Sequence, residues 1–231
     1  MIHPTIAGDC FWCAKVAVNF LAWSAMHGSA ASELKDMVTT YEPPDPGQII
    51  GYAWATFTIV WLVAAFWRKR VQKRQPAAER LIHVVWMTAA AVLLIWDQTW
   101  YMGLNARFLP TRLWIEELGA WVTVAGAAFA IWARLHLGRN WSGTVTIKED
   151  HSLIRTGPYK YIRHPIYTGL LLGLAGSALA IGKYRAILGF TMFLVGLVRK
   201  AKREESFLAE EFGPAFEEHK KKTGFLLPRF S

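Results

Sequence analysis

Cysteine is scarce in this chain, which has only 2 among its 231 residues. Both stand in one short motif, CFWC, as Cys10 and Cys13. A C-x-x-C pair can be redox-active or can supply half of a structural zinc site. The sequence has no second cysteine pair to complete such a site, and the motif lies in an apolar segment. We therefore interpret both cysteines as packing residues and expect no metal partner.

Three patterns typical of common protein classes are missing. No glycine-rich loop follows a predicted strand, which argues against the soluble Rossmann-type nucleotide-binding fold. No internal repeat is visible, which argues against transporters built from duplicated halves. The N-terminus shows no charged segment followed by a small-residue cleavage site, so we expect no secretory signal.

Acidic residues are in the minority, with 17 Asp and Glu against 26 Lys and Arg and a formal net charge of +9. In a soluble protein such an excess would suggest a nucleic-acid partner. Here the basic residues gather in loops between apolar runs, as in RKRVQKRQPAAER at 68–80. The positive-inside rule explains this pattern better. We therefore expect no nucleic acid, and we expect loops 68–80 and 134–165 and the C-terminal tail to lie in the cytoplasm.

Long apolar runs, by contrast, are abundant, and 53% of the residues are hydrophobic. A helix needs about 17–25 predominantly apolar residues to cross a bilayer. Three candidate spans have this character: 49–67, 81–104 and 113–137. Two shorter candidates, 166–181 and 184–198, abut each other. The apolar stretch 6–26 carries polar residues and is either a sixth span or an interfacial helix. The sequence thus predicts an all-α integral membrane protein with five core transmembrane helices, a candidate sixth at the N-terminus, and a cytoplasmic C-terminal cofactor-binding region.

We expect two regions along the chain. Transmembrane helices make up 1–112, and a functional core makes up 113–231, because nearly all motif-like sequence follows residue 134. Within that core the alternating residues GTVTI at 143–147 are typical of a short strand. The loop around them is therefore predicted to be partly ordered.

The end of the last span carries a clear stop signal. Leu208, Phe212 and Phe216 recur at helical spacing, which predicts that the helix continues into the cytoplasm. Gly213–Pro214 should end this helix and start a short one at 214–222. We expect the apolar tail GFLLPRFS to fold back on the membrane.

The motif RHPIYTG at 163–169 is the first candidate site. Pro165 suits the first turn of a helix, where its missing N–H is harmless. Arg163 and His164 then lie at a helix N-terminus, where free N–H groups and the helix dipole favour an anion. We expect Tyr167 and Gly169 to face the bundle interior. An interfacial belt of Arg and Tyr is the alternative, but the fixed order of residues favours a binding site.

The second candidate is the pair Glu204–Glu205, preceded by Arg199 and Lys200. Adjacent residues on a helix point about 100° apart, so one carboxylate can face inward while the other faces water. A buried Glu could hold a pair of ribose hydroxyls or an ammonium group. On its own, however, the pair fits a solvated charged face better.

Taken together, the two motifs resemble the isoprenylcysteine carboxyl methyltransferase family, which is related to the phospholipid methyltransferases of membranes. The family pattern is RHPxYxG, a helical hairpin and then EExxLxxxFGxxYxxY, and the resemblance covers about residues 113–230. Two positions depart from it. Phe216 and His219 replace the tyrosines of YxxY, and Lys200 stands where the family usually has arginine, with Arg199 one place before it.

The resemblance implies S-adenosylmethionine as the methyl donor. Arg163 and His164 would bind its methionine carboxylate, and Tyr161 and Tyr167 would line the pocket. Glu204 or Glu205 would bind the ribose or the amino group. Pro165 and Gly169 complete the binding motif, while the catalytic positions fall on Lys200 and Arg199, where the family arginine would orient an acceptor carboxylate.

The acceptor implied by the resemblance is lipophilic and reaches the site from the membrane lipid. Prenylcysteine, a phospholipid amine and a small thiol all remain open. Glycines at 169, 173 and 176 would allow close helix approach beside the site, and packing alone would also explain them. Two other functions are considered: an NADPH-dependent membrane sterol-type reductase, and a non-catalytic membrane protein that keeps the fold.

Overall fold

The computed structural model describes residues 43–65, 77–96, 103–138 and 153–229. By its internal contacts the chain divides into Met1–Pro43 and Pro44–Ser231, and all described helices belong to the second unit. The predictions for Cys10, Cys13, the stretch 6–26 and the strand at 143–147 lie outside the described residues.

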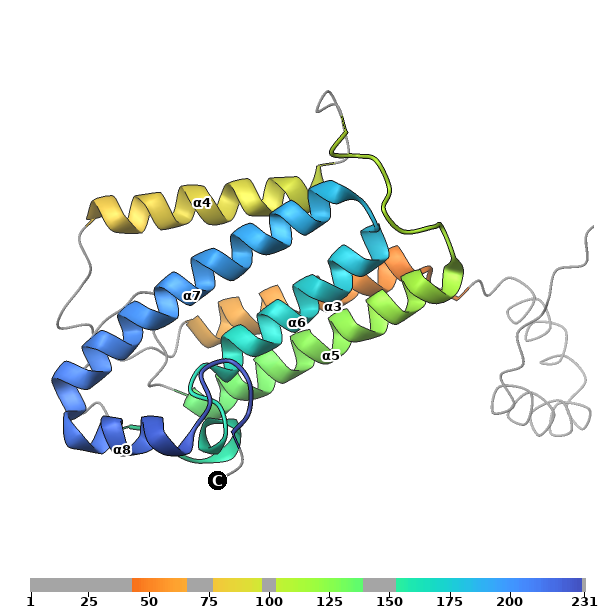
Figure 1. Ribbon diagram of the computed structural model, residues 1–231. Helices are drawn as coiled ribbons and strands as arrows, with labels where there is room; N and C mark the ends of the chain where they lie inside the picture. Colours follow the sequence, from red (N-terminus) through yellow and green to blue (C-terminus); the bar gives the residue numbers. More distant parts are fainter. Residues whose placement is uncertain (1–42, 66–76, 97–102, 139–152, 230–231) are drawn as a thin grey trace, which may run out of the picture. The chain divides into compact units, whose positions relative to one another are not determined.

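The described part of this second unit is built of helices (Figure 1). In chain order they are α3 (Pro46–Ala65), α4 (Ala77–Ile95), α5 (Leu113–Leu137), the 3₁₀ turn η2 (Gly157–Lys160), α6 (Pro165–Ile181), α7 (Tyr184–Phe212) and α8 (Pro214–Lys222). Among the described residues, extended pairing is limited to two isolated bridges, Arg107 with Lys183 and Ile162 with Gly224. The all-α class is therefore confirmed for the described part of the chain.

The glycine and proline signals place the C-terminal helices correctly. Gly182, in the left-handed region at φ 61°, ends α6, and Gly213, at φ 47°, separates α7 from α8. Positive φ is strained for other residues, which explains glycine at these breaks. As predicted, α7 continues past the apolar segment, and α8 begins at Pro214.

The predicted extent of the second span is wrong, because α4 ends at Ile95 rather than at residue 104. A cation from another helix satisfies the last carbonyls of α4. Arg185 Nη1 donates to the carbonyls of Leu93 at 2.8 Å and Leu94 at 2.7 Å. A positive charge there also complements the negative end of the helix dipole.

Arg134 plays the matching part for α3. It is 2% exposed, and its guanidinium donates to the carbonyl of Ala64 at 2.6 Å and to that of Gly138 at 2.9 Å. Its Cζ also lies 5.8 Å from the ring centroid of Trp61. Arg134 thus fastens the C-terminal end of α3 to α5, as Arg185 fastens α4 to α7.

Helices α5 and α6 have the closest contact in the bundle. An added Cβ on Gly169 would lie 2.6 Å from the backbone N of Ala130, and one on Gly176 would lie 2.5 Å from that of Thr123. Gly126 of α5 faces the backbone of Gly173 just as closely. The expectation that glycines allow close approach here is confirmed, and helix packing is their visible role.

Hydrogen bonds inside the bundle join α3 to this pair. Trp54 Nε1 donates to Ser177 Oγ at 3.0 Å, and Ser177 Oγ donates to the carbonyl of Gly173 at 3.0 Å. Thr123 Oγ1 donates within α5 to the carbonyl of Gly119 at 2.9 Å. Buried polar groups with such partners are stable in an apolar interior.

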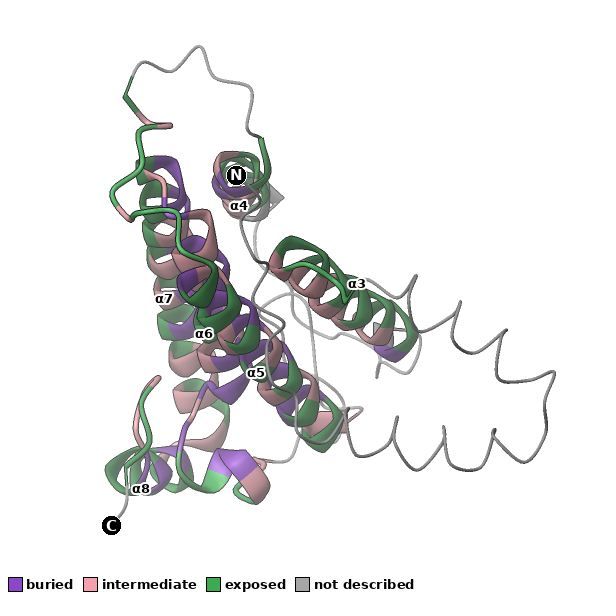
Figure 2. Ribbon diagram, turned by 90° about the vertical axis from the view of Figure 1, so that its right-hand side faces the viewer, coloured by how far each residue is buried: buried purple, intermediate pink, exposed green. Residues whose placement is uncertain are grey.

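The outer faces of these helices are apolar. Two helices, Pro46–Ala64 and Leu113–Leu137, are long and apolar enough to cross a membrane, while Leu81–Ile95 and Pro165–Ile181 are shorter apolar helices. Only 6% of the apolar window in α3 is buried, and Ile59 and Leu62 are 62% and 60% exposed, so α3 is not the core helix of a soluble protein (Figure 2). Apolar surface of this extent is typical of a helix that faces lipid or another protein. The chain is an all-α membrane protein, and the predicted five or six crossings stay a prediction.

Candidate functional site

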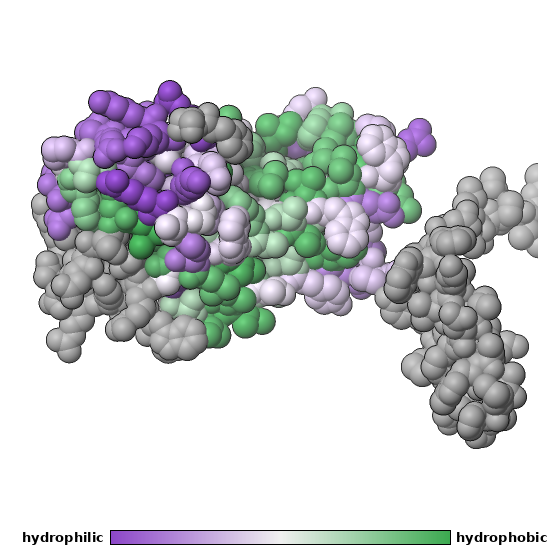
Figure 3. All heavy atoms as spheres, turned by 90° about the horizontal axis from the view of Figure 1, so that it is seen from below, coloured by the Kyte–Doolittle hydropathy of each residue, from purple (hydrophilic) through white to green (hydrophobic). Residues whose placement is uncertain are grey.

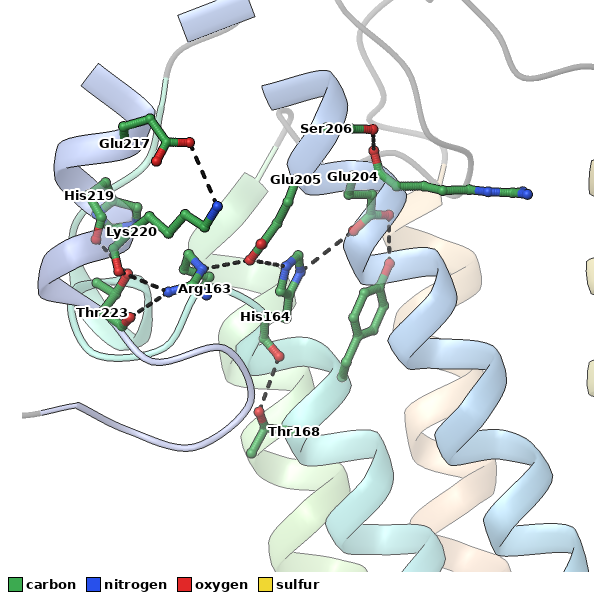
Figure 4. Close-up of polar contacts among 12 residues, drawn as sticks. Arg163, His164, Thr168, Glu204, Glu205, Ser206, Glu217, His219, Lys220 and Thr223 are labelled. Carbon is green, nitrogen blue, oxygen red and sulfur yellow. Dashed lines mark hydrogen bonds and ion pairs between the residues drawn. The ribbon is translucent and has the colours of Figure 1, made fainter. Parts of the chain in front are cut away.

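Hydrophilic side chains gather at the end of the unit that carries α8, and apolar side chains cover much of the rest of that face (Figure 3). Six predicted site residues meet at this end, where α6 begins beside α7. We call them the polar cluster: Arg163, His164, Tyr167, Lys200, Glu204 and Glu205. Figure 4 shows how Arg163, His164, Glu204 and Glu205 lie toward one another. At about 1.5 Å per residue, Glu204 lies about 30 Å along α7 from Tyr184, which equals the thickness of a bilayer's hydrocarbon core.

The start of α6 has the predicted geometry. His164 is the N-cap, with φ −121° and ψ 57°, and Pro165 is the first helical residue. The carbonyl of His164 accepts the backbone N–H of Thr168 at 3.0 Å, which closes the first helical turn. Arg163 and His164 therefore lie at the N-terminus of α6, as the sequence indicated.

Arg163 is engaged by the protein itself. Its Nε donates to Glu205 Oε1 at 2.6 Å, and its Nη1 donates to the carbonyls of Thr223 and, at 3.2 Å, Lys220. The side chains of Arg163 and Glu205 are only 11% and 13% exposed. A close ion pair with little exposure and additional hydrogen bonds is a firm structural contact.

His164 lies between the two carboxylates. Its Nε2 is 3.3 Å from Glu205 Oε1, and its Nδ1 is 3.7 Å from Glu204 Oε2. The imidazole is stacked against the ring of Tyr167, with centroids 5.5 Å apart and planes 8° apart. This arrangement fixes the direction of both ring nitrogens.

Glu204 is the more accessible carboxylate, with 22% of its side chain exposed. Tyr167 Oη donates to Glu204 Oε1 at 2.6 Å. Lys200 precedes Glu204 by one helical turn and so shares its face of α7, and its Nζ is 5.6 Å from the ring centroid of Tyr167. Glu204 therefore presents negative charge beside an aromatic ring and a cation.

The environment shifts the pKa values of groups around the cluster. Burial alone raises the pKa of Glu205, but the hydrogen bonds from His164 and Arg163 and their positive charge outweigh it, so the net pKa is lowered. Burial, and then the charge of Glu204, raise the pKa of Tyr159, which keeps its hydroxyl protonated. That hydroxyl donates to the carbonyl of Ala133 at 3.4 Å.

Four predicted site residues lie apart from the polar cluster. Tyr161 is 40% exposed, and its ring lies beside Lys160, whose Nζ is 5.5 Å from the ring centroid. Gly169 packs against α5, and Pro165 is buried as the first residue of α6. Arg199 is exposed on α7, and among the described residues no contact joins it to the cluster.

The C-terminal tail takes a position that sequence reasoning missed. It lies against the start of α6: the backbone N–H of Arg163 donates to the carbonyl of Gly224 at 2.9 Å, and that of His164 donates to the carbonyl of Phe225 at 3.3 Å. The sequence did not predict this contact with the protein, and the predicted contact of the tail with the membrane stays a prediction. The available signal was that amides just before a helix need acceptors from elsewhere in the chain.

No group of three or more His, Cys, Asp or Glu within the described ranges has an arrangement that could hold a metal ion. The cluster instead offers carboxylate acceptors, a phenol, an imidazole and an ammonium group. Such a set suits an organic ligand with hydroxyl and amino groups.

Comparisons with known proteins match the same part of the chain. The model of the isoprenylcysteine carboxyl methyltransferase family matches residues 119–210. A protein-S-isoprenylcysteine O-methyltransferase of Schizosaccharomyces pombe is 30% identical over 99 residues, which are 42% of this chain and 42% of that protein. The cobalt-zinc-cadmium resistance protein CzcN of Cupriavidus metallidurans is 30% identical over 141 residues, 59% of this chain and 55% of that protein.

A solved structure of a eukaryotic intramembrane Ras methyltransferase, an isoprenylcysteine carboxyl methyltransferase, is 22% identical to the chain. The match covers 68% of this chain and 56% of that structure's chain, with a TM-score of 0.47. The chain spans about half the length of the curated relatives named above. All residues of the polar cluster lie within the matched segment. Residues 119–210 are therefore similar to the isoprenylcysteine carboxyl methyltransferase family.

Proposed function

We propose that this protein is a membrane methyltransferase that moves a methyl group from S-adenosylmethionine to a lipophilic acceptor. The observation that carries the proposal is the polar cluster, in which Glu204 presents a partly exposed carboxylate beside Tyr167 and Lys200. Its depth along α7 supports a site at the membrane–water interface, where a water-soluble donor can meet a lipid-like acceptor. The excess of basic residues in loop 68–80 supports the cytoplasmic side and a multi-pass topology.

Glu204, rather than Glu205, is the carboxylate that we assign to the donor. Glu205 already accepts from Arg163 and lies within 3.3 Å of His164 Nε2. Glu204 accepts the hydroxyl of Tyr167 through one oxygen. A carboxylate has about four lone-pair sites, so Glu204 retains acceptor capacity for ribose hydroxyls or an amino group. The chemistry of the residues present therefore fits the nucleoside-like donor.

Arg163 takes a different role from the one the resemblance implied. Because its Nε and Nη1 donate to Glu205 and to tail carbonyls, we propose that it holds the cluster together instead of binding the methionine carboxylate. The residues that would face the ligand are His164, Tyr167 and Glu204. We assign no ligand contact to Tyr161 or Arg199.

The donor supplies a methyl group that is already activated on a sulfonium centre. The residues of this chain then have to position the acceptor and exclude water, because a carboxylate acceptor needs no general base. We propose that Lys200 orients an anionic acceptor by charge attraction, as the arginine would in the family pattern. Methylation of a carboxylate removes its charge, which weakens its attraction to Lys200 and favours release of the ester.

A prenylcysteine-like carboxylate is the acceptor best supported by the relatives, one of which is named a protein-S-isoprenylcysteine O-methyltransferase. A second candidate function is a metal-tolerance membrane protein without methyl transfer. It is supported by the longer match to a relative named a cobalt-zinc-cadmium resistance protein. Donor binding separates the two candidates.

Isothermal titration of the full chain in lipid nanodiscs tests the assignment of Glu204. We expect wild-type protein to bind S-adenosylhomocysteine, and Glu204→Gln to weaken binding by about tenfold or more, the usual effect of losing a charge-assisted hydrogen bond. Glu211→Gln is the matched control, because Glu211 is exposed on the same helix. Unchanged binding by Glu204→Gln would refute the assignment, and binding of NADPH instead would support a reductase.

A further inference from the structure

The tail after α8 lies beyond residue 210, where the family match ends, yet it contacts the polar cluster directly. Gly224 pairs with Ile162 in an isolated parallel bridge. The backbone N–H of Gly224 donates to the carbonyl of Tyr161 at 3.0 Å, and the carbonyl of Gly224 accepts from Arg163. The tail therefore runs alongside the residues that lead into α6.

Side chains add to these backbone bonds. Thr168 Oγ1 donates to the carbonyl of Leu226 at 2.7 Å, and Arg163 Nη1 donates to the carbonyl of Thr223. The carbonyls at 223–226 thus supply acceptors for donors on both sides of Pro165. The backbone N–H groups of Arg163 and His164 lie before the helix and need acceptors from elsewhere in the chain, which this segment supplies.

Phe225 makes the most specific contact. Its ring meets the imidazole of His164 edge to face, with centroids 5.2 Å apart and planes at 73°. The Cζ of Arg163 lies 5.8 Å from the same ring centroid, within the range of a cation–π contact. One side chain therefore touches both motif residues that precede α6, while Tyr167 stacks on the imidazole from within α6.

We propose that Phe225, supported by the segment 223–226, is a positioning residue of the site. It holds the His164 ring so that its two nitrogens reach Glu204 and Glu205, and it holds Arg163 on Glu205. The expected effect on ligand binding rests on the proposed function, whereas the positioning of Arg163 and His164 by Phe225 does not. The helical body of α6 is held independently by its glycine contacts with α5, so loss of Phe225 should loosen the site without unfolding α6.

Hydrogen–deuterium exchange of the full chain in nanodiscs, read together with S-adenosylhomocysteine titration, tests the proposal. For Phe225→Ala we expect amide exchange at Arg163 and His164 to accelerate about tenfold, with unchanged exchange in the second half of α6. We expect the dissociation constant to rise about tenfold. Phe225→Tyr, which keeps the ring, should restore both values.

Leu227→Ala is the matched control, because Leu227 lies just past the segment and is 77% exposed. It should change neither readout. Thr168→Val removes the bonds of the Thr168 hydroxyl to the carbonyls of Leu226 and His164, and it should also speed exchange at His164.

Wild-type exchange and binding in Phe225→Ala would overturn the proposal, and so would an equal loss in Leu227→Ala. If wild-type protein does not bind the ligand but Phe225→Ala still speeds exchange at His164, the positioning role stands and the proposed function fails.

Discussion

At the scale of single residues, neighbouring carboxylates in one helix have different surroundings. Glu205 is held by Arg163 and His164, whereas Glu204 contacts Tyr167 and keeps a larger exposed fraction. The divergence of adjacent helical residues could be predicted from the sequence, because it follows from helix geometry. Which of the two carboxylates forms the ion pair could not be predicted, because it depends on the guanidinium of Arg163, which lies just before a different helix, α6.

The ion pair of Glu205 makes stability depend on pH. Its pKa is lowered in the folded protein, so its contribution is present above the unfolded pKa of about 4.3 and is lost as pH falls through the folded value. We expect the thermal midpoint of wild-type protein in nanodiscs to decrease as the pH is lowered below about 4.5. The midpoint of Glu205→Gln should be lower than that of wild type at neutral pH and should change less on acidification.

Glu218→Gln is the control for this series, because the contact of Glu218 with Lys222 is exposed to solvent. It should leave both the midpoint and its pH dependence unchanged. An acid profile of Glu205→Gln that matches wild type would contradict the role of the Arg163–Glu205 pair.

At the scale of elements, α5 and α6 form the rigid pair on which the site is built. Their glycines let the backbones touch, and the site residues extend from the N-terminal end of α6. The bounds of α5, α6, α7 and α8 could be predicted because glycine, proline and apolar spacing are local signals. The end of α4 could not, because its last carbonyls are satisfied by Arg185, which is distant in sequence.

Gly126→Ala tests this packing. The added methyl group would meet the backbone of Gly173, so the helices must separate, and we expect a loss of about 1–3 kcal/mol in the free energy of unfolding. Gly51→Ala is the control, because nothing lies within 4 Å of its added Cβ. Denaturant unfolding in mixed micelles measures both. Equal stability of the two variants would contradict close packing of α5 on α6.

At the scale of the whole molecule, the polar cluster lies about 30 Å along α7 from Tyr184, and we propose that a membrane helix meets water at this depth. Apolar runs predicted a membrane protein, the orientation drawn from loop charges stays a prediction, and the two motifs predicted most of the residues that meet. The tail contact through Phe225 was not predictable, because GFLLPRFS has no pattern that distinguishes a protein surface from a membrane surface. The exposure of the Tyr161 ring could not be predicted either, because the direction of side chains next to a 3₁₀ turn follows no simple sequence period.

The most direct test of the account is transfer of a labelled methyl group from S-adenosylmethionine by the full chain in nanodiscs. A farnesylcysteine analogue, a phospholipid extract and a small thiol serve as parallel acceptors. We predict label in a base-labile ester of the farnesylcysteine analogue, with the rate reduced about a hundredfold in Glu204→Gln, as expected when a group that positions the reactants is lost. Absence of label from all three acceptors, or equal rates for wild type and Glu204→Gln, would contradict it.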